Sequence, residues 1–365
     1  MQVAQCEGRH AEALSAADVR IVRPRFLDDP MIPLGVITLI SGRAGVSKST
    51  LSIHRAAMAT CGRLEGDYKG RPINVAFSAT EDSLSMQKAR LVAADADMSK
   101  VRFITMQDTH DGITTDTGMT IPDDLPMIRR IIKDNDIKLW IIDPITSCIT
   151  GDTNKRDDVR TALDPLAALA DDLGIAIVGI LHFNKGGGYS SDKVSGSHAF
   201  RDIARSLILV VRDDDTGDCV MTIDKSSYSM AQGTSYSYAL MSCDVPTDDG
   251  DIASVPKVTG FMRSDRDVNE VLNRNYSQSS GVEVAERAER NEVIGWLVDY
   301  LSSGPAAFAE IEKAAKAEGY TKKQLRNAKQ RASSPWVVSV RDSSYEGRGQ
   351  RYLWQLSDTE PEDTD

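Results

Sequence analysis

The stretch LISGRAGVSKST, residues 39–50, is the part of the sequence that indicates the fold. It matches the pattern G-x-x-x-x-G-K-[ST] of a phosphate-binding loop at all but one position, with Gly42, Lys48 and Ser49 where the pattern expects them. Where the pattern has glycine immediately before the lysine, this chain has Ser47. The question is therefore whether these residues form a working nucleotide site or an inactive remnant.

The sequence around this loop supports a working site. Residues 35–40 predict a buried strand and residues 48–60 a helix, which is the setting in which backbone N–H groups surround a phosphate. If the backbone at Ser47 has a positive φ, its side chain costs on the order of 1 kcal/mol relative to glycine, which strains the loop without removing it. We expect the nucleotide to be bound by Gly42, Ala44, Gly45, Val46, Ser47, Lys48, Ser49 and Thr50.

Strands and helices alternate along the first two thirds of the chain. Apolar strands are predicted at 73–79, 101–106, 138–143 and 175–182, and helices from Ser83 and over 127–135 and 158–174. An antiparallel pair of strands is predicted at 205–213 and 219–225. The acidic residues between them lack the spacing of a calcium-binding loop, so we predict a solvated turn there. Apolar strands alternating with helices indicate an α/β fold with a mainly parallel sheet, covered on both faces.

Two carboxylates follow predicted strands. Asp143 ends the strand in LWIIDP and suits a Walker B acid, which orients Mg²⁺ through water beside Ser49. Glu81, in FSATED, suits the acid that positions the attacking water near the γ-phosphate. The alternative for each residue is a cap of a turn or of the next helix, where the helix dipole favours a negative charge.

The order of these motifs, followed by ILHFNK (180–185) and GSHAFRDIARS (196–206), resembles the RecA-like hexameric helicase family. Within the AAA-type P-loop ATPases it is most similar to plasmid replication helicases of the RepA type. The resemblance covers about residues 25–230. It implies a RecA-like P-loop core that uses ATP and Mg²⁺, bound by the lysine and serine of the loop, with Glu81 as the catalytic carboxylate and Asp143 as the Walker B acid.

The same resemblance assigns three further residues. It implies that His182 senses the γ-phosphate, that Arg205 is an arginine finger reaching the neighbouring subunit's site, and that Lys225 is a second trans-acting cation. Such cations stabilise charge that develops on the transferred phosphoryl group. From the residues alone, a satisfied strand-end histidine and surface salt bridges are the alternatives. Family patterns have glycine where this chain has Ser47 and near the position of Ser229.

Two loops follow catalytic strands, at 147–158 and 185–197. The second is rich in glycine and serine and contains Lys185, Tyr189 and Lys193. In RecA-like rings, loops at these positions line the channel and hold single-stranded DNA, and cations beside an aromatic residue suit that task. Disorder without a ligand is the alternative.

The C-terminal part differs in charge from the rest of the chain. The net charge is −11, but residues 305–356 carry ten Lys and Arg against five Asp and Glu, so the remainder carries about −16. Helices are predicted over 285–303, FAEIEKAAKAEGY and TKKQLRNAKQRAS, followed by a hairpin, which is the order of a winged helix-turn-helix. The second helix of such a motif enters the major groove of duplex DNA, so Lys322, Lys323 and Arg326 would contact phosphates. Protein contact is the alternative.

These observations divide the chain into five predicted segments. We expect an N-terminal segment (1–30), the ATPase domain (31–245), strand remnants and a linker (246–284), the winged-helix domain (285–357) and an acidic tail (358–365). Five cysteines without a CxxC pair, and the lack of any membrane-length apolar run or signal-peptide pattern, predict a cytoplasmic protein with no membrane partner.

The leading hypothesis is an ATP-driven motor, a homo-oligomeric ring, expected to be a hexamer, that moves on single-stranded DNA in plasmid or phage replication. One alternative is a DNA-binding regulator in which ATP switches assembly and the winged helix recognises a sequence. Another is a recombinase-type filament built on the same core.

Overall fold

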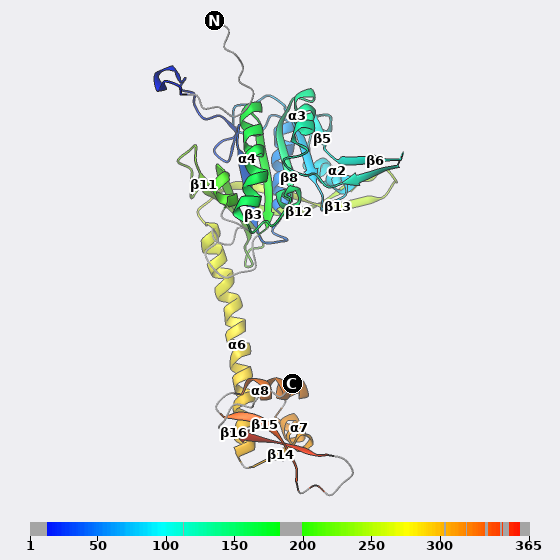
Figure 1. Ribbon diagram of the computed structural model, residues 1–365, viewed down its shortest axis with the longest axis vertical. Coiled ribbons are helices and arrows are strands. Elements are labelled where there is room, and N and C mark those ends of the chain that lie inside the picture. Colours follow the sequence, from blue (N-terminus) through cyan, green and yellow to red (C-terminus); the bar gives the residue numbers. More distant parts are fainter. Residues whose placement is uncertain are drawn as a thin grey trace. The chain divides into compact units, whose positions relative to one another are not determined.

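The computed structural model describes residues 13–111, 113–182, 199–302, 304–318, 320–332, 335–343, 345 and 350–357, without the side chains of 113, 276–292, 317 and 331. It divides into two compact units, Met1–Asn273 and Arg274–Asp365, each of which is described by itself (Figure 1). Within the described residues, no helix combines the length and the apolar character that crossing a membrane requires.

The first unit is built on a nine-stranded sheet with the strand order β13-β12-β11-β10-β3-β9-β8-β4-β5. The six strands from β10 to β5 run parallel, and β11, β12 and β13 extend the sheet in antiparallel fashion. The predicted α/β fold with a mainly parallel sheet is therefore confirmed. The strands are β3 (Ile37–Gly42), β4 (Asn74–Ala79), β5 (Val101–Phe103), β8 (Ile137–Asp143), β9 (Ala176–His182), β10 (Ser206–Arg212), β11 (Cys219–Ser226), β12 (Ser235–Pro246) and β13 (Ile252–Ser264).

Helices cover both faces of this sheet and bury a core on each side. Along β8, Leu139 and Ile141 belong to one core, whereas Trp140 and Ile142 belong to the other, because successive side chains of a strand point to opposite faces. The first core contains residues of α1 (Lys48–Thr60) and α2 (Leu84–Ala93). The second contains residues of α3 (Leu125–Asp134), α4 (Arg156–Leu173) and α5 (Ala199–Ile203).

Several structural features of this unit were not predicted, among them the strand β12. A short pair, β1 (Phe26–Asp28) and β2 (Ile32–Pro33), begins inside the segment assigned to the N-terminus, and Leu27 is only 1% exposed. The predicted strand 101–106 is shorter, and Met106 instead begins a hairpin of β6 (Met106–His110) and β7 (Ile113–Thr117), which projects from the sheet in Figure 1.

Another difference is the predicted linker, which is largely regular structure. β13 pairs with β12 along almost its whole length, and α6 (Val268–Ser302) begins far before the predicted helix start at 285. Val268 and Val271 are fully buried in the second core. The sequence interpretation gave too much weight to the polar composition of this stretch and missed the helical spacing of these valines.

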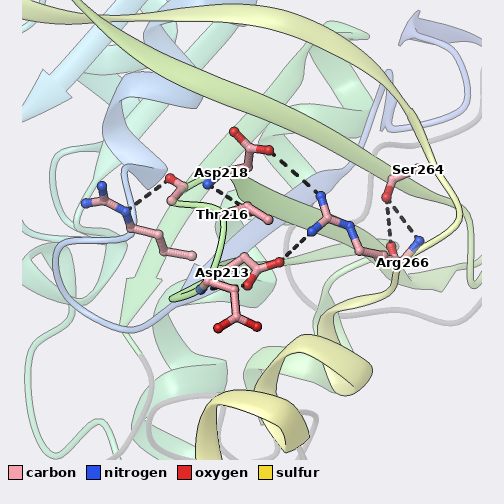
Figure 2. Close-up of polar contacts among 8 residues, drawn as sticks. Asp213, Thr216, Asp218, Ser264 and Arg266 are labelled. Carbon is pink, nitrogen blue, oxygen red and sulfur yellow. Dashed lines mark hydrogen bonds and ion pairs between the residues drawn. The ribbon is translucent and has the colours of Figure 1, made fainter. Parts of the chain in front are cut away.

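The start of α6 is fixed to the turn between β10 and β11. Figure 2 shows Arg266 reaching back to this turn, where its guanidinium lies 2.5 Å from Asp213 and 3.9 Å from Asp218. The Asp213 side chain is fully buried, so the prediction of a solvated turn is wrong for this residue. A buried carboxylate needs such a partner, because leaving it unpaired would be strongly destabilising.

The second unit contains the end of α6, helices α7 (Phe308–Ala317) and α8 (Lys322–Arg331), and a three-stranded sheet. Its strands are β14 (Ala306–Ala307), β16 (Tyr352–Ser357) and β15 (Trp336–Arg341), in that order across the sheet. A core that includes Leu297, Ile311 and Leu325 joins the three helices. The two predicted helices and the hairpin after them are present. The acidic tail 358–365 lies outside the described residues.

Candidate nucleotide-binding site

The predicted phosphate loop connects β3 to α1 at the carboxyl edge of the parallel strands. A Cβ atom at Gly42 would collide with the Val210 carbonyl oxygen of the adjacent strand, so only glycine fits there. Gly45 has a φ of +79°, a conformation that glycine adopts without strain. Val46 packs into the core and holds the loop down, whereas Ala44 stays exposed. The loop then enters α1, whose first N–H groups lack partners within the helix.

Ser47 is the N-cap of α1 and has φ 67° and ψ 30°, the left-handed conformation. Its side chain makes no capping hydrogen bond. Ser47 therefore keeps the positive φ that the glycine of the motif accommodates, although its side chain carries a Cβ. The loop keeps its shape at a strain of roughly 1 kcal/mol.

We expect Ser47→Gly to leave ATP hydrolysis unchanged or to raise it modestly, because glycine removes this strain without removing a backbone N–H group. The measurement is the steady-state rate of phosphate release, together with the melting temperature. Ser49→Ala is the matched control, and it should lower the rate through loss of its hydroxyl. A large loss of activity in Ser47→Gly would show that the Ser47 hydroxyl has a role of its own.

Lys48 opens α1 and folds back over the loop. Its ammonium donates to the carbonyl oxygens of Gly42 (3.1 Å) and Arg43 (2.8 Å), and the residue is 4% exposed. Burial lowers the pKa of Lys48 to about 8, while the charges of Asp143 and Glu81 favour its ammonium form. A cation held in this way is poised to exchange carbonyl oxygens for phosphate oxygens.

Asp143 and Ser49 meet beneath the loop. Burial raises the pKa of Asp143, and the Ser49 hydroxyl opposes this by stabilising the carboxylate. Among the described residues, Asp143 Oδ1 has no hydrogen-bond partner. It borders a cavity of about 20 Å³, the space of one water molecule or ion, which Ser49 and Glu81 also line. These residues fit Mg²⁺, which binds through one or two protein oxygens, waters and the phosphates of its nucleotide.

His182 connects the loop to the predicted catalytic carboxylate. Its Nδ1 lies 3.2 Å from the Lys48 ammonium, and its Nε2 lies 3.6 Å from Glu81 Oε1. Because an ammonium only donates, Nδ1 accepts and Nε2 carries the proton that points toward Glu81. The ends of β9 and β4 and the start of α1 thus converge on one spot.

Arg90 and Gln87, which the sequence analysis did not single out, determine which of the neighbouring carboxylates is available to a substrate. Arg90 forms an ion pair with Asp82 at 2.5 Å, which leaves Glu81, with a side chain 58% exposed, able to reach a substrate. Gln87 is buried and donates to the Asp82 carbonyl at 2.9 Å, so it fixes the segment that carries Glu81. The Ser83 N-cap and the helical spacing of 83, 87 and 90 are the signal that could have found them.

Comparison with known families agrees with this geometry. Residues 7–188 match the family model described as an AAA domain. The match supports an AAA-type P-loop ATPase. No curated protein matches the chain. Lys48, Glu81, Asp143 and His182 all lie within the matched residues, and an AAA domain suggests nucleotide hydrolysis with ATP and Mg²⁺, which such domains generally use.

Arg205 and Lys225 lie outside the matched AAA segment. They lie at the end of the parallel strands that is opposite to the phosphate loop. The Arg205 backbone N–H donates to the carbonyl oxygen of Ile37, where β3 begins, whereas the phosphate loop follows its end at Gly42. Lys225 pairs with Leu207 across the β10–β11 ladder and donates to the Arg201 carbonyl oxygen at 2.6 Å. The two cations are neighbours, but neither belongs to this chain's own phosphate site. Lys185 and Lys193 lie outside the described residues.

Proposed function

We propose that the protein is an ATP-driven motor of plasmid or phage replication, a ring of identical subunits that moves along single-stranded DNA. The observation that carries the proposal is the convergence of Lys48, Asp143, Glu81 and His182 at one sheet edge. Lys48 and the loop N–H groups hold the triphosphate, Ser49 and Asp143 hold Mg²⁺, and Glu81 orients the attacking water. Bound Mg²⁺ would neutralise charge on the phosphate oxygens.

The position of Arg205 supports assembly. β3 has six residues, so its two ends are roughly 16 Å apart at about 3.3 Å per residue, farther than an arginine side chain reaches. Arg205 is exposed and borders a cavity of about 490 Å³ together with Asp171 and Tyr228. A cation placed here can complete only the site of another subunit, which is the role that the resemblance to hexameric helicases assigns to it.

The segment before β1 also supports assembly. Ile21 and Val22 are 100% and 76% exposed, and Leu14 and Val19 are 73% and 59% exposed. The segment is held at its base, where Asp67 forms ion pairs with Arg23 and Arg25. These exposed aliphatic side chains offer a surface to a protein partner, which in this proposal is a second copy of the chain.

The C-terminal unit supplies DNA affinity in this proposal, as a winged helix-turn-helix that can also meet duplex DNA. α7 and α8 are two short helices joined by a turn, and Thr321 with Gln324 forms a capping box that fixes the start of α8. Lys323 and Arg326 are exposed on α8, whereas Lys322 lies 3.5 Å from Glu312. DNA phosphates would compete with that exposed ion pair, which contributes little by itself.

We expect the substitution of Lys322, Lys323 and Arg326 by Ala to weaken DNA binding and to flatten its salt dependence, by roughly one unit of slope for each lost phosphate contact. The measurement is the affinity for an oligonucleotide across a series of salt concentrations. The control replaces Lys69, Lys100 and Lys133, which lie in the first unit, and should leave the slope nearly unchanged. Equal slopes in both variants would reassign α8 to protein contact.

A regulator in which ATP switches assembly is the second candidate, favoured by the helix pair and hairpin of the C-terminal unit. Displacement of streptavidin from the end of a biotinylated single strand separates the two. A motor displaces it only with hydrolysable ATP. A regulator leaves it in place and binds one duplex sequence tightly, with slow turnover.

A further inference from the structure

A cavity of about 370 Å³ lies between α8 and the sheet of the C-terminal unit. This volume falls within the roughly 300–1,000 Å³ range of sites that take small ligands or parts of larger ones. Two tryptophans and two cations dominate its walls. It is lined by Arg326, Lys329, Gln330, Ala332, Trp336, Val337 and Trp354.

The two tryptophans differ in how the unit uses them. Trp354 is 8% exposed and packs on Phe308 with ring centroids 4.9 Å apart, so it belongs to the core. The Lys329 ammonium lies 5.1 Å from the Trp354 ring and donates to Ser339 Oγ at 2.6 Å, so it closes this side of the cavity. Trp336 is only partly buried, at the start of β15, and lines the cavity with part of its indole still accessible.

The charges of the lining are of one sign. Among the described residues, both ionisable side chains of the lining, Arg326 and Lys329, are cations, and none is a carboxylate. Burial lowers the pKa of Lys329, which means that its ammonium has lost water and gains from an anion nearby. Arg326 is exposed, with its guanidinium 5.8 Å from the Phe308 ring, where a phosphate could reach it.

An indole beside cations is the arrangement that proteins use for an unstacked base with its phosphate. Stacking on an aromatic ring holds the base, and the cations hold the backbone, without selecting a sequence. Duplex DNA offers no such base, because its bases are stacked and paired. An acidic peptide would use the cations but would leave the indole without a partner.

We propose that this cavity binds one unpaired nucleobase of single-stranded nucleic acid against Trp336, with the adjoining phosphate on Arg326 and Lys329. The site deepens the proposed function, since it rests on the C-terminal unit binding nucleic acid. It gives that unit a preference for single strands that a major-groove helix alone does not provide.

The test uses the full chain and two fluorescent probes, an oligothymidylate of 15 nucleotides and an abasic strand of the same length. Trp336→Ala should weaken binding of the thymidylate by about 5- to 150-fold, the equivalent of the ~1–3 kcal/mol that one base–aromatic contact contributes. The same variant should bind the abasic strand as the unmodified protein does. Trp336→Phe should restore most of the loss, because a phenyl ring also stacks.

Two control variants locate the effect. Trp296 stacks on Tyr300 and lines no part of this cavity, so Trp296→Phe should leave both affinities unchanged. Lys323 is exposed on α8 but outside the cavity, so Lys323→Ala should weaken both probes equally and flatten the salt dependence.

A measurement without any substitution guards against a variant that fails to fold. A strand containing 5-bromodeoxyuridine, irradiated in complex with the unmodified protein, should form an adduct at Trp336 that mass spectrometry can locate. Adducts only elsewhere, or equal loss of both probes in Trp336→Ala, would overturn the proposal. The proposal would also be overturned if Trp336→Ala lowered the affinity for a 15-residue polyglutamate but not the affinity for the thymidylate. If the unmodified protein binds neither probe, it is the proposed DNA function that fails.

Discussion

Lys48→Ala is expected to abolish measurable ATP hydrolysis, with a loss of at least about 10²–10³-fold, the scale for removing one electrostatic stabiliser of a transition state. The ammonium is buried and lies against the Gly42 and Arg43 carbonyl oxygens of the loop, where the phosphates of a nucleotide are expected to bind. The measurement is Mg²⁺-dependent phosphate release, with a thermal melt to show that the variant is folded. Lys133→Ala, at an exposed position of α3, is the matched control and should keep full activity.

The pH dependence of ATP binding gives this prediction a second readout. The pKa of Lys48 in the free site is about 8, so the ammonium is present below pH 8 and is lost above it. A bound triphosphate favours the charged form, so affinity should fall as the pH rises through 8 and binding should take up a proton there. Lys48→Ala should lack this step. Normal hydrolysis by Lys48→Ala would contradict the assignment of the site.

Arg205→Ala is expected to keep ATP binding nearly intact and to lower turnover by orders of magnitude, since an arginine finger contributes about 10³–10⁵ in rate. Arg205 lies at the opposite end of β3 from its own phosphate loop, so under the proposed function its effect is exerted in another subunit. The decisive measurement mixes Arg205→Ala with Lys48→Ala subunits, each inactive alone.

Mixed assemblies contain some interfaces with an intact Lys48 on one side and an intact Arg205 on the other. Hydrolysis should therefore return in part upon mixing. The trans assignment is wrong if mixed oligomers form and stay inactive, or if Arg205→Ala alone hydrolyses ATP at the normal rate. Arg205 would then be a structural cation.

The parts of the fold that local sequence determines could be predicted well. α1 has the predicted bounds, 48–60, and α4 ends at Leu173, just before Gly174, whose positive φ of 60° suits glycine at a helix end. The strands of the parallel sheet are continuous apolar runs because both of their faces are buried, which makes them easy to recognise.

β13 could not be recognised from the same signals. It is the edge strand of the sheet, where proline is tolerated, and it contains Pro256 and Gly260, which weaken its strand pattern. The sequence therefore indicated only strand remnants and a linker in this stretch. The Arg266–Asp213 pair joins residues 53 positions apart, and no local pattern specifies such a partner.

In the candidate site, the sequence indicated the residue types at the carboxyl edge but not their contacts. The strand ends at Glu81, Asp143 and His182 were predictable because parallel strands bring their carboxyl ends together. The ion pair between Arg90 and Asp82, which leaves Glu81 available to a substrate, depends on how α2 packs. Only the structure shows this packing.

The measurement that tests the central claim most directly is the rate of ATP hydrolysis by the full chain in Mg²⁺, with and without single-stranded DNA. The mass of the assembly is determined in the same solution. We predict hydrolysis that requires Mg²⁺, rises when non-specific single-stranded DNA is added, and comes from an assembly larger than one chain. A protein that does not bind ATP at high micromolar concentrations, or a monomer whose hydrolysis ignores single-stranded DNA, would contradict the account.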